Sequence, residues 1–230
     1  MNYLQLANRL RLESGGISGT GPTTVVGNSN NEYARVCNWI ADADVEIQLK
    51  YDDWRFMWNQ FSLATVAGTA EYTEATITGS ASLGVSRYDL ESFRYYLTSA
   101  GIGNEQHIIH REYRYFRERW LIGNNRASTG APSECTFLPN RKIHLAPIPN
   151  AIYTVTGDFY RNSVRMTLDG DEPLYPSQFH MLPVWWALVK YAGLEEAPAV
   201  YTNAQNQLSL LWGAFERQER PNVTFGGPLV

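Results

Sequence analysis

Residues 172–221, EPLYPSQFHMLPVWWALVKYAGLEEAPAVYTNAQNQLSLLWGAFERQERP, decide the fold, because their pattern is typical of two antiparallel helices joined by a tight turn. Nearly every side chain from 179 to 194 is apolar or aromatic. A helix that is apolar on every face is buried on every face. The sequence therefore predicts that the rest of the chain is organised around this first helix of the pair.

Proline and glycine mark the ends of these two helices. Pro183 removes one backbone donor, so we expect the first helix to kink or restart near its beginning. Gly193 suits a helix stop and Pro198 suits a first helical turn, which predicts a link over residues 193–197. The core stripe of the second helix follows the spacing of three and four residues, and it consists of Tyr201, Ala204, Leu208, Leu211 and Phe215.

The opposite face of the second helix carries no charge between residues 199 and 215. Exposed helices usually carry Glu and Lys pairs, and charged residues are depleted at the centres of interfaces. We therefore expect this face to contact another protomer or a different partner protein. The residues predicted to make that contact are Asn203, Asn206 and Trp212; a bland polar face is the alternative.

Length and composition exclude several classes of protein. A chain of 230 residues buries a sizeable core without metal or disulfide, and 44% hydrophobic with 18% charged residues is typical of a globular protein. The net charge of −4 argues against binding driven by nucleic-acid phosphates, although it leaves open a channel for DNA. Cys37 and Cys135 have no CxxC spacing and should be buried thiols. The longest apolar run, residues 181–189, is too short to span a membrane, so we expect a soluble protein.

The N-terminal part of the chain predicts two helices separated by a loop. The first covers residues 2–14, and a loop rich in Gly, Ser, Thr and Asn follows to residue 31, which a partner could order. The second runs to about Trp54, with Glu46 and Lys50 as an ion pair on its surface. Its acidic residues and those just after it are expected on a solvated face rather than at a metal: Asp42, Asp44, Asp52 and Asp53.

From residue 58 the pattern changes to short strands. Strands are predicted over 61–66, 71–77, 92–99, 106–111, 134–138, 142–146 and 152–161, with one short helix at 113–121. His107 and His110 would face opposite sides of one strand, which argues against a metal site. The sequence thus predicts an α+β fold, a helical bundle from N- and C-terminal helices with an inserted antiparallel β-rich region. Its expected parts are residues 1–57, 58–170, 171–221 and a tail, 222–230.

The order of these pieces resembles the head-to-tail adaptor (head completion) proteins of short-tailed bacteriophages. The resemblance begins with MNYLQLANRLRLESG and VCNWIADADVEIQLKYDDWRFM. It continues through YRYFRERW and GAPSECTFLPNRKIHLAPIPNAIYTVTGDFYR, and it is greatest over residues 174–221. It covers most of the chain and is weakest over residues 67–104. Its specificity lies in the order of several loose patterns rather than in a catalytic motif.

This resemblance implies a structural protein of the virion, made in the host bacterial cytoplasm and located in the neck between capsid and tail. It implies a homo-oligomeric, dodecameric ring that joins the phage portal protein to tail and nozzle proteins. DNA would pass through its axial channel without sequence-specific binding, and no membrane is involved. The tail would dock on the portal through Val223, Phe225, Leu229 and Val230, whereas a floppy terminus is the alternative in the free protein.

Two other functions remain open from the sequence. A tail-associated enzyme would need two carboxylates facing across a cleft, and Glu46, Asp53, Glu105 and Glu112 are available. No GxSxG, HExxH or GxxxxGK[ST] motif is present, so we predict no enzyme, with no catalytic, metal or cofactor residues. The other possibility is a different tail or receptor-binding component of the virion, built around the β-rich middle.

Overall fold

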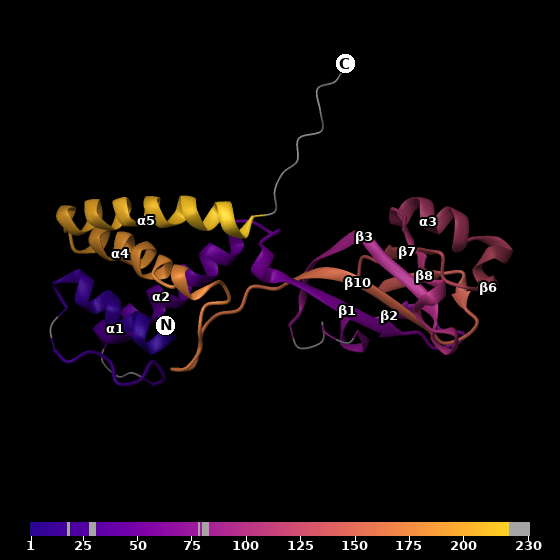
Figure 1. Ribbon diagram of the computed structural model, residues 1–230, viewed down its shortest axis with the longest axis horizontal. Helices are drawn as coiled ribbons and strands as arrows, with labels where there is room; N and C mark the ends of the chain where they lie inside the picture. The colour runs from indigo at the N-terminus through magenta and orange to yellow at the C-terminus, as the bar shows by residue number, and fades with distance from the viewer. Residues whose placement is uncertain (18, 28–30, 78, 80–82, 221–230) are drawn as a thin grey trace, which may run out of the picture. The chain divides into compact units, whose positions relative to one another are not determined.

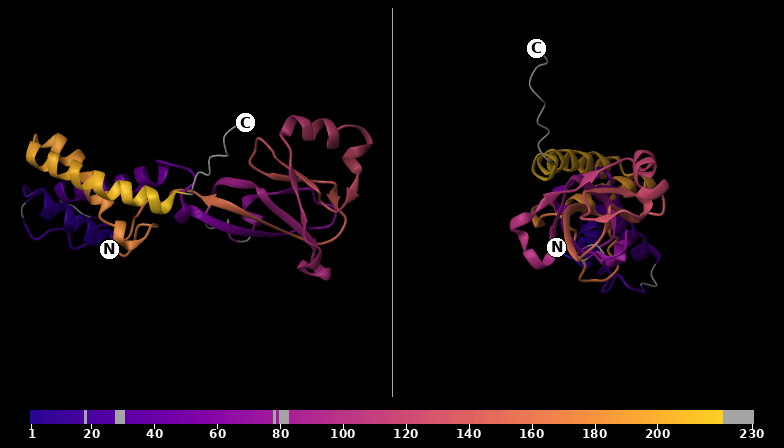
Figure 2. Two further views of the ribbon diagram at one scale, coloured as in Figure 1. Left: turned by 45° about the horizontal axis from the view of Figure 1, so that its top comes forward. Right: turned by 90° about the vertical axis from the view of Figure 1, so that its right-hand side faces the viewer.

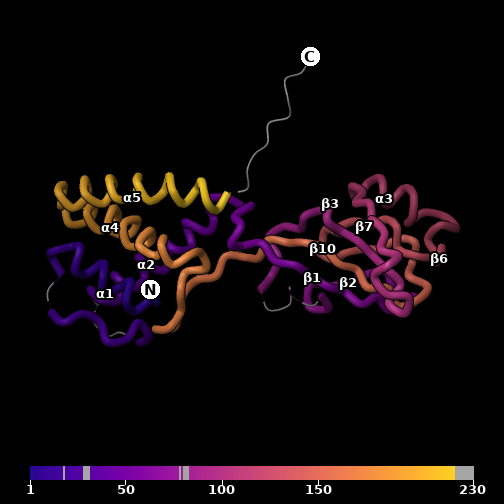
Figure 3. Tube along the Cα trace, viewed as in Figure 1, coloured from indigo at the N-terminus to yellow at the C-terminus, as the bar shows by residue number. Residues whose placement is uncertain are grey.

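The computed structural model describes residues 1–17, 19–27, 31–77, 79 and 83–220. The chain divides into two compact units, which we call the helical unit (Met1–Met57 and Ser163–Val230) and the β unit (Trp58–Asn162). Helices from both ends of the chain flank the β-rich middle, which confirms the predicted α+β fold. The chain enters the β unit once and leaves it once (Figure 3).

The helical unit is built around α4, Leu182–Leu194. Helices α1 (Tyr3–Ser14) and α2 (Asn31–Leu49) pack on one side of α4, and α5 (Pro198–Glu219) runs antiparallel along the other (Figures 1 and 2). Most of α4 is buried, as its apolar sequence predicts, whereas Leu194 at its end is 54% exposed. Its buried residues are Leu182, Pro183, Val184, Trp185, Ala187, Leu188, Tyr191 and Ala192.

Helix α4 begins where the sequence predicts but ends later than predicted. A short 3-10 helix, Ser177–Phe179, precedes α4, and Pro183 lies in the first turn, so the predicted restart is confirmed. The helix continues through Gly193, and the left-handed backbone conformation falls on Glu196, with φ of 50°. The predicted stop at Gly193 is therefore wrong. The turn is closed by the Ala197 amide, which donates to the carbonyl of Ala192.

Helix α2 ends at Leu49 rather than near Trp54. Trp54 is fully buried and donates its indole N–H to the carbonyl of Ile47 at 3.2 Å, so the chain folds back over the end of the helix. The predicted surface pair of Glu46 and Lys50 is also absent from the described contacts. Glu46 instead accepts hydrogen bonds from Lys190 Nζ at 2.6 Å and from the indole N–H of Trp186, which ties α2 to α4.

A buried carboxyl group lies where the sequence predicted a solvated one. Asp44 is 1% exposed and accepts a hydrogen bond of 2.7 Å from Gln48 Nε2. The Gln48 amide also donates to the carbonyl of Val164 and accepts from its N–H, at 3.0 and 2.8 Å. Gln48 thereby ties the segment that returns from the β unit to α2. The spacing of Asp44 from Ile40 and Ile47 places it on the buried stripe of α2, so the sequence did contain a signal that this carboxyl group is buried.

The described part of the loop after α1 is held by the chain itself. Asp169 accepts hydrogen bonds from the Val25 N–H at 2.6 Å and the Thr24 hydroxyl at 3.0 Å. Asn8 donates to the carbonyl of Pro22. Gly21 has φ of 88°, and a Cβ atom there would overlap the Asn8 side chain, so this position requires glycine. The acidic run that contains Asp169 is the turn before the last helices, as predicted.

Three sheets make up the described part of the β unit. The first has the antiparallel strand order β1-β10-β3-β4, the second the order β2-β8-β7-β5, and β6 pairs with β9. Two short pairs, β5 with β7 and β6 with β9, are parallel, and all others are antiparallel. The strands are β1 (Trp58–Ala64), β2 (Glu71–Tyr72), β3 (Val85–Leu97), β4 (Gln106–His107), β5 (Ile109–His110), β6 (Thr129–Gly130), β7 (Glu134–Phe137), β8 (Ile143–Ala146), β9 (Ile148–Pro149) and β10 (Tyr153–Arg161).

Aromatic rings fill the core of the β unit. Phe61, Phe93 and Phe159 are buried, and the rings of Phe61 and Phe93 are 5.0 Å apart. Gly157 lies against them, where a Cβ atom would come within 2.7 Å of the Phe61 ring. The inward side chains of β10 match the predicted alternation. Cys135 in this core and Cys37 in the helical unit are both buried free thiols, as predicted.

Several predicted strands differ in length. The predicted strand 71–77 shrinks to β2 and is followed by a 3-10 helix, Glu74–Thr76. The predicted strand 106–111 splits into β4 and β5, which lie in different sheets, so His107 and His110 are not on one strand. Helix α3, Tyr113–Trp120, is close to its prediction. Across the described ranges, no group of three or more His, Cys, Asp or Glu side chains is placed to hold a metal ion.

Replacing Asp44 with Asn should remove part of the pH dependence of stability. Burial raises the pKa of the Asp44 carboxyl from 3.8 to about 6, so the folded state binds this proton more tightly than the unfolded state. The stabilisation is complete below about pH 4 and is lost as the pH rises through about 6, a change of about 3 kcal/mol. The Asn variant should therefore gain stability relative to the natural chain over that window.

Urea unfolding of both proteins between about pH 4 and pH 7 measures this difference. Other titrating groups are common to the two chains, so the difference isolates Asp44. Two stability curves that stay parallel over the whole window would contradict a raised pKa at this position.

Candidate functional site

Helix α5 is long and poorly buried. Only Ala204, Phe215 and Glu219 of its 22 residues are buried, and the predicted core residue Tyr201 is 43% exposed. Leu208 and Leu211 are half-buried. Helices in proteins owe most of their stability to the packing of one face. The helix therefore relies on a narrow stripe against α4 and leaves most of its surface uncovered.

The uncovered side of α5 is uncharged along most of its length. We define the outer face of α5 by six exposed residues, namely Ala199, Thr202, Asn203, Asn206, Ser209 and Leu210. Leu210 is 71% exposed, although a leucine gains about 2 kcal/mol when it is buried. An uncharged face with a protruding leucine has the composition of an interface centre.

The three residues predicted for this interface do not lie on one face. Asn203 and Asn206 both belong to the outer face of α5. Trp212 follows Asn203 by nine residues, or about two and a half helical turns, so the two side chains lie on opposite sides of the helix. Its ring packs against Trp54, Trp186 and Phe215, with ring centroids 6.0, 5.6 and 5.6 Å away. Trp212 therefore has a packing role in the helical unit in addition to any contact with a partner.

Trp212 also lines a shallow groove along the flank of α5. The groove has a volume of about 290 Å³, and we call it the tryptophan groove. Lys50 is its one charged lining residue. The others are Trp186, Gln205, Leu208, Ser209, Trp212 and Gly213. The outer face and the tryptophan groove are thus two adjoining, largely uncharged surfaces of one helix, which share Ser209.

The four residues predicted to anchor the tail, Val223, Phe225, Leu229 and Val230, lie outside the described residues. The structure does describe the end of α5 that precedes them. The guanidinium of Arg220 lies 4.1 Å from the centroid of the Tyr51 ring, and the Tyr51 hydroxyl donates to Glu216 at 2.8 Å. These contacts hold the end of α5 against Tyr51.

The carboxylates considered for an enzyme are divided between the two units. Glu46 and Asp53 belong to the helical unit, whereas Glu105 and Glu112 belong to the β unit. Glu46 is engaged by Lys190 and Trp186, and Glu105 accepts a weak hydrogen bond of 3.4 Å from Thr156. The carboxyl groups with a raised pKa are instead those of Asp44 and Glu219, and burial is the main cause for both.

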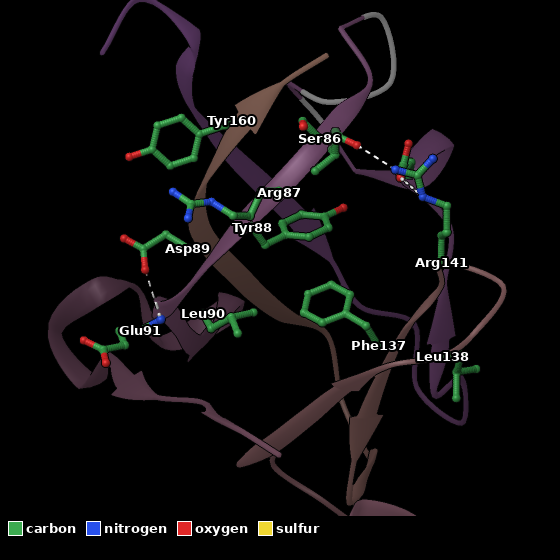
Figure 4. A pocket seen from close by; sticks show the side chains of 12 residues that line it. Ser86, Arg87, Tyr88, Asp89, Leu90, Glu91, Phe137, Leu138, Arg141 and Tyr160 are labelled. Carbon is green, nitrogen blue, oxygen red and sulfur yellow. Dashed lines mark hydrogen bonds and ion pairs between the residues drawn. The ribbon is translucent and has the colours of Figure 1, made fainter. Parts of the chain in front are cut away.

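A groove in the β unit has no counterpart in the sequence analysis. Its volume is about 630 Å³, and β3 and the hairpin of β7 and β8 form its walls (Figure 4). A single exposed leucine between charges, Leu90, is the only sequence signal for it, and a lone exposed leucine is unremarkable. The groove depends on contacts between strands far apart in the sequence.

Residues 1–227 match a family model described as SU10 adaptor protein. The match includes both units, all of α5 and most of the tail. No curated protein matches the chain. Within the part of the chain that the structure describes, no helix has the length and apolar character needed to cross a membrane.

Leu210 and Trp212 should respond differently to substitution. Trp212→Ala should lower the free energy of unfolding by about 2 kcal/mol or more, because it removes packing against three aromatic rings. Leu210→Asp should change it by no more than about 0.5 kcal/mol, because Leu210 is exposed in the single chain. Urea unfolding of the two variants tests this. Equal destabilisation would place Leu210 in the core of the helical unit.

Proposed function

The chain belongs to the SU10 adaptor protein family, an adaptor family of phage, and we propose that it forms the head-to-tail adaptor ring in the neck of a short-tailed phage virion. The family is a structural one and is not known for enzymatic activity. In our proposal the ring joins the portal protein to tail and nozzle proteins. The observation that carries the ring is the exposed, uncharged surface of α5.

The geometry of α5 favours contacts that repeat from copy to copy. The outer face of α5 and the tryptophan groove meet at Ser209, but Leu210 and Trp212 point to opposite sides of the helix. One copy can therefore present Leu210 to one neighbour and Trp212 to another. A head-to-tail contact of this kind generates a closed ring when the rotation between copies allows it. Asn203, Asn206 and Leu210 would lie on one side of the contact and Trp212 on the other. The proposed number of copies, twelve, comes from the family resemblance alone.

The tail is the proposed portal contact. Residues 222–230 include four apolar side chains, Val223, Phe225, Leu229 and Val230, and no charged side chain. An apolar segment at a chain terminus gains affinity by burying those side chains, and it loses conformational entropy when it is ordered. The contact between Arg220 and Tyr51 holds the end of α5, which precedes this segment in the sequence.

The acidic balance of the chain is compatible with an axial channel for DNA. Sequence-independent binding to DNA requires clustered Lys and Arg, whereas this chain has 19 basic and 23 acidic residues. A channel formed from such subunits would let DNA pass without holding it. We propose no sequence-specific contact with DNA and no contact with a membrane.

Sedimentation of the purified protein, alone and mixed with purified portal rings, tests the adaptor function. We expect it to co-sediment with the portal, and negative-stain images should show an added ring of density. Deleting residues 222–230 should weaken that co-sedimentation without changing the stability of either unit. A protein that never binds the portal would contradict the adaptor function, and unchanged binding after the deletion would contradict the role of the tail.

Cysteine cross-linking tests the head-to-tail contact between copies. Lys50→Cys in the tryptophan groove and Leu210→Cys on the outer face should cross-link to each other in assembled rings. Each variant by itself should give no cross-linked dimer, because each supplies one side of the contact only. The natural cysteines, Cys37 and Cys135, are buried and contribute little background.

Two outcomes would contradict this contact while leaving the adaptor function intact. One is a ring on the portal with no cross-link in the mixture. The other is a cross-link formed by a single variant alone, which would mean that the same patch of two copies meets itself. Asn38→Cys, on an exposed position of α2, serves as the matched control for accidental collisions.

A further inference from the structure

In the part of the chain that the structure describes, one edge of strand β3 has no neighbouring strand along part of its length. On one side β3 pairs with β10 from Val85 to Leu97. On the other side β4 pairs only with Arg94 and Tyr95. Among the described residues, positions 86–91 therefore lie on a free strand edge. Such an edge is a template for another strand, and proteins usually cover or protect it.

The groove of Figure 4 runs along this free edge. Seven consecutive residues of β3, from 85 to 91, line it. Successive side chains of a strand point to opposite faces of its sheet. A groove lined by every residue of a stretch therefore follows the edge rather than lying over one face. Tyr160 and Phe137 lie on its two sides (Figure 4).

Backbone groups of β3 are directed into the groove. The Ser92 hydroxyl donates to the Asp89 carbonyl at 2.7 Å and accepts from the Asp158 N–H of β10 at 2.7 Å. This bridge shows that the Asp89 carbonyl faces β10. Because backbone groups alternate in direction along a strand, those of Tyr88 face the other way, toward the groove. At one end of the edge, the Arg141 guanidinium donates to the Val85 carbonyl, as a strand amide would.

One wall of the groove is apolar. Tyr88 stacks on Phe137 with ring centroids 4.8 Å apart, and Leu138 lies beside them. At the end of this edge β3 bulges away from β10, because Asp89 pairs with Asp158 but Arg94 pairs with Thr156. The bulge leaves Leu90 37% exposed.

The opposite wall and the bulged end are polar and partly acidic. Arg87 lies over the Tyr160 ring at 4.8 Å, and Arg141 has Glu74 within 3.9 Å, so neighbours already engage both cations. Asp89 and Glu91 bring two exposed carboxylates to the bulged end. A ligand that carries a Lys or Arg at that end would complement them.

We propose that this groove binds an extended segment of a partner polypeptide, which adds to the edge of β3 as a further strand. The backbone of the segment pairs with that of Tyr88. Its alternate apolar side chains lie over Tyr88, Phe137 and Leu138, its other side chains are polar, and a basic one faces Asp89 and Glu91. Strand addition of this kind takes affinity from backbone hydrogen bonds and specificity from the pockets for alternate side chains. The site lies in the β unit and uses none of the residues proposed above for the ring or for the portal contact.

Alternatively, Arg87, Asp89 and Glu91 could be charges that protect the strand edge from association with other strands. Protection accounts for the charges alone. It does not account for an apolar wall beside the same edge, because a protected edge gains nothing from a groove in which side chains can be buried.

Binding of a fluorescein-labelled hexapeptide, TVKVTV, to the full chain tests the proposal by fluorescence anisotropy. The peptide TVKPTV, which lacks one backbone donor, should bind about tenfold more weakly. Glu91→Lys should weaken the binding of TVKVTV and strengthen the binding of TVEVTV, in which a glutamate replaces the lysine. Damage to the fold would weaken the binding of both peptides. Glu118→Lys, an exposed charge reversal on α3, should change neither affinity.

Further measurements locate the peptide. Amide hydrogen exchange over residues 86–90 should slow when TVKVTV binds. Leu138→Asp should weaken every peptide by about tenfold, and Ile102→Asp, at a position 68% exposed, is its matched control. The proposal is overturned if TVKVTV does not bind, or if TVKVTV and TVKPTV bind equally well. It is also overturned if the bound peptide slows amide hydrogen exchange in another part of the chain and not over residues 86–90. Self-association of the chain that Leu138→Asp abolishes would also overturn it, in favour of a second copy as the occupant.

Discussion

The burial of α4 is the constraint on which the helical unit depends. Every face of an apolar helix that is exposed to water lowers the stability of the fold, so such a helix needs neighbours on all sides. Those neighbours come from both ends of the chain, with α1 and α2 on one side and α5 on the other. Two polar ties fix the arrangement. Glu46 joins α2 to Trp186 and Lys190 of α4, and Gln48 holds the backbone of Val164 where the chain returns from the β unit.

The same constraint explains why α5 is so exposed. Helix α4 requires one more neighbour on its free side, and a single stripe of α5 is enough to provide it. The remaining surface of α5 contributes little to the fold, so its composition is free to serve other contacts. A surface that only had to be soluble would carry charge, yet residues 199–215 carry none. The β unit likewise has two parts, a core filled by aromatic side chains and an edge of β3 that makes no contact needed for that core.

Local signals in the sequence predicted much of the fold, and contacts between distant residues account for what was missed. Pro183 marked the start of α4, and the alternation along β10 was correct, because both depend on neighbours in the sequence. The burial of Asp44 depends on Gln48 and on a segment more than a hundred residues away. The bulge of β3 depends on β10. For the candidate site, the uncharged face was visible in the sequence, but the packing of Trp212 against Trp54 and Trp186 was not.

The placement of the β unit between α2 and α4 has a consequence for synthesis of the chain. Residues 58–162 separate the two helices that must pack together, and at about 5–20 residues per second their translation takes roughly 5–20 s. During that interval the apolar sides of α1 and α2 have left the ribosome while α4 has not yet been made. The β unit, continuous in sequence, can complete its fold first. The helices that are made earliest are therefore among the last to be buried.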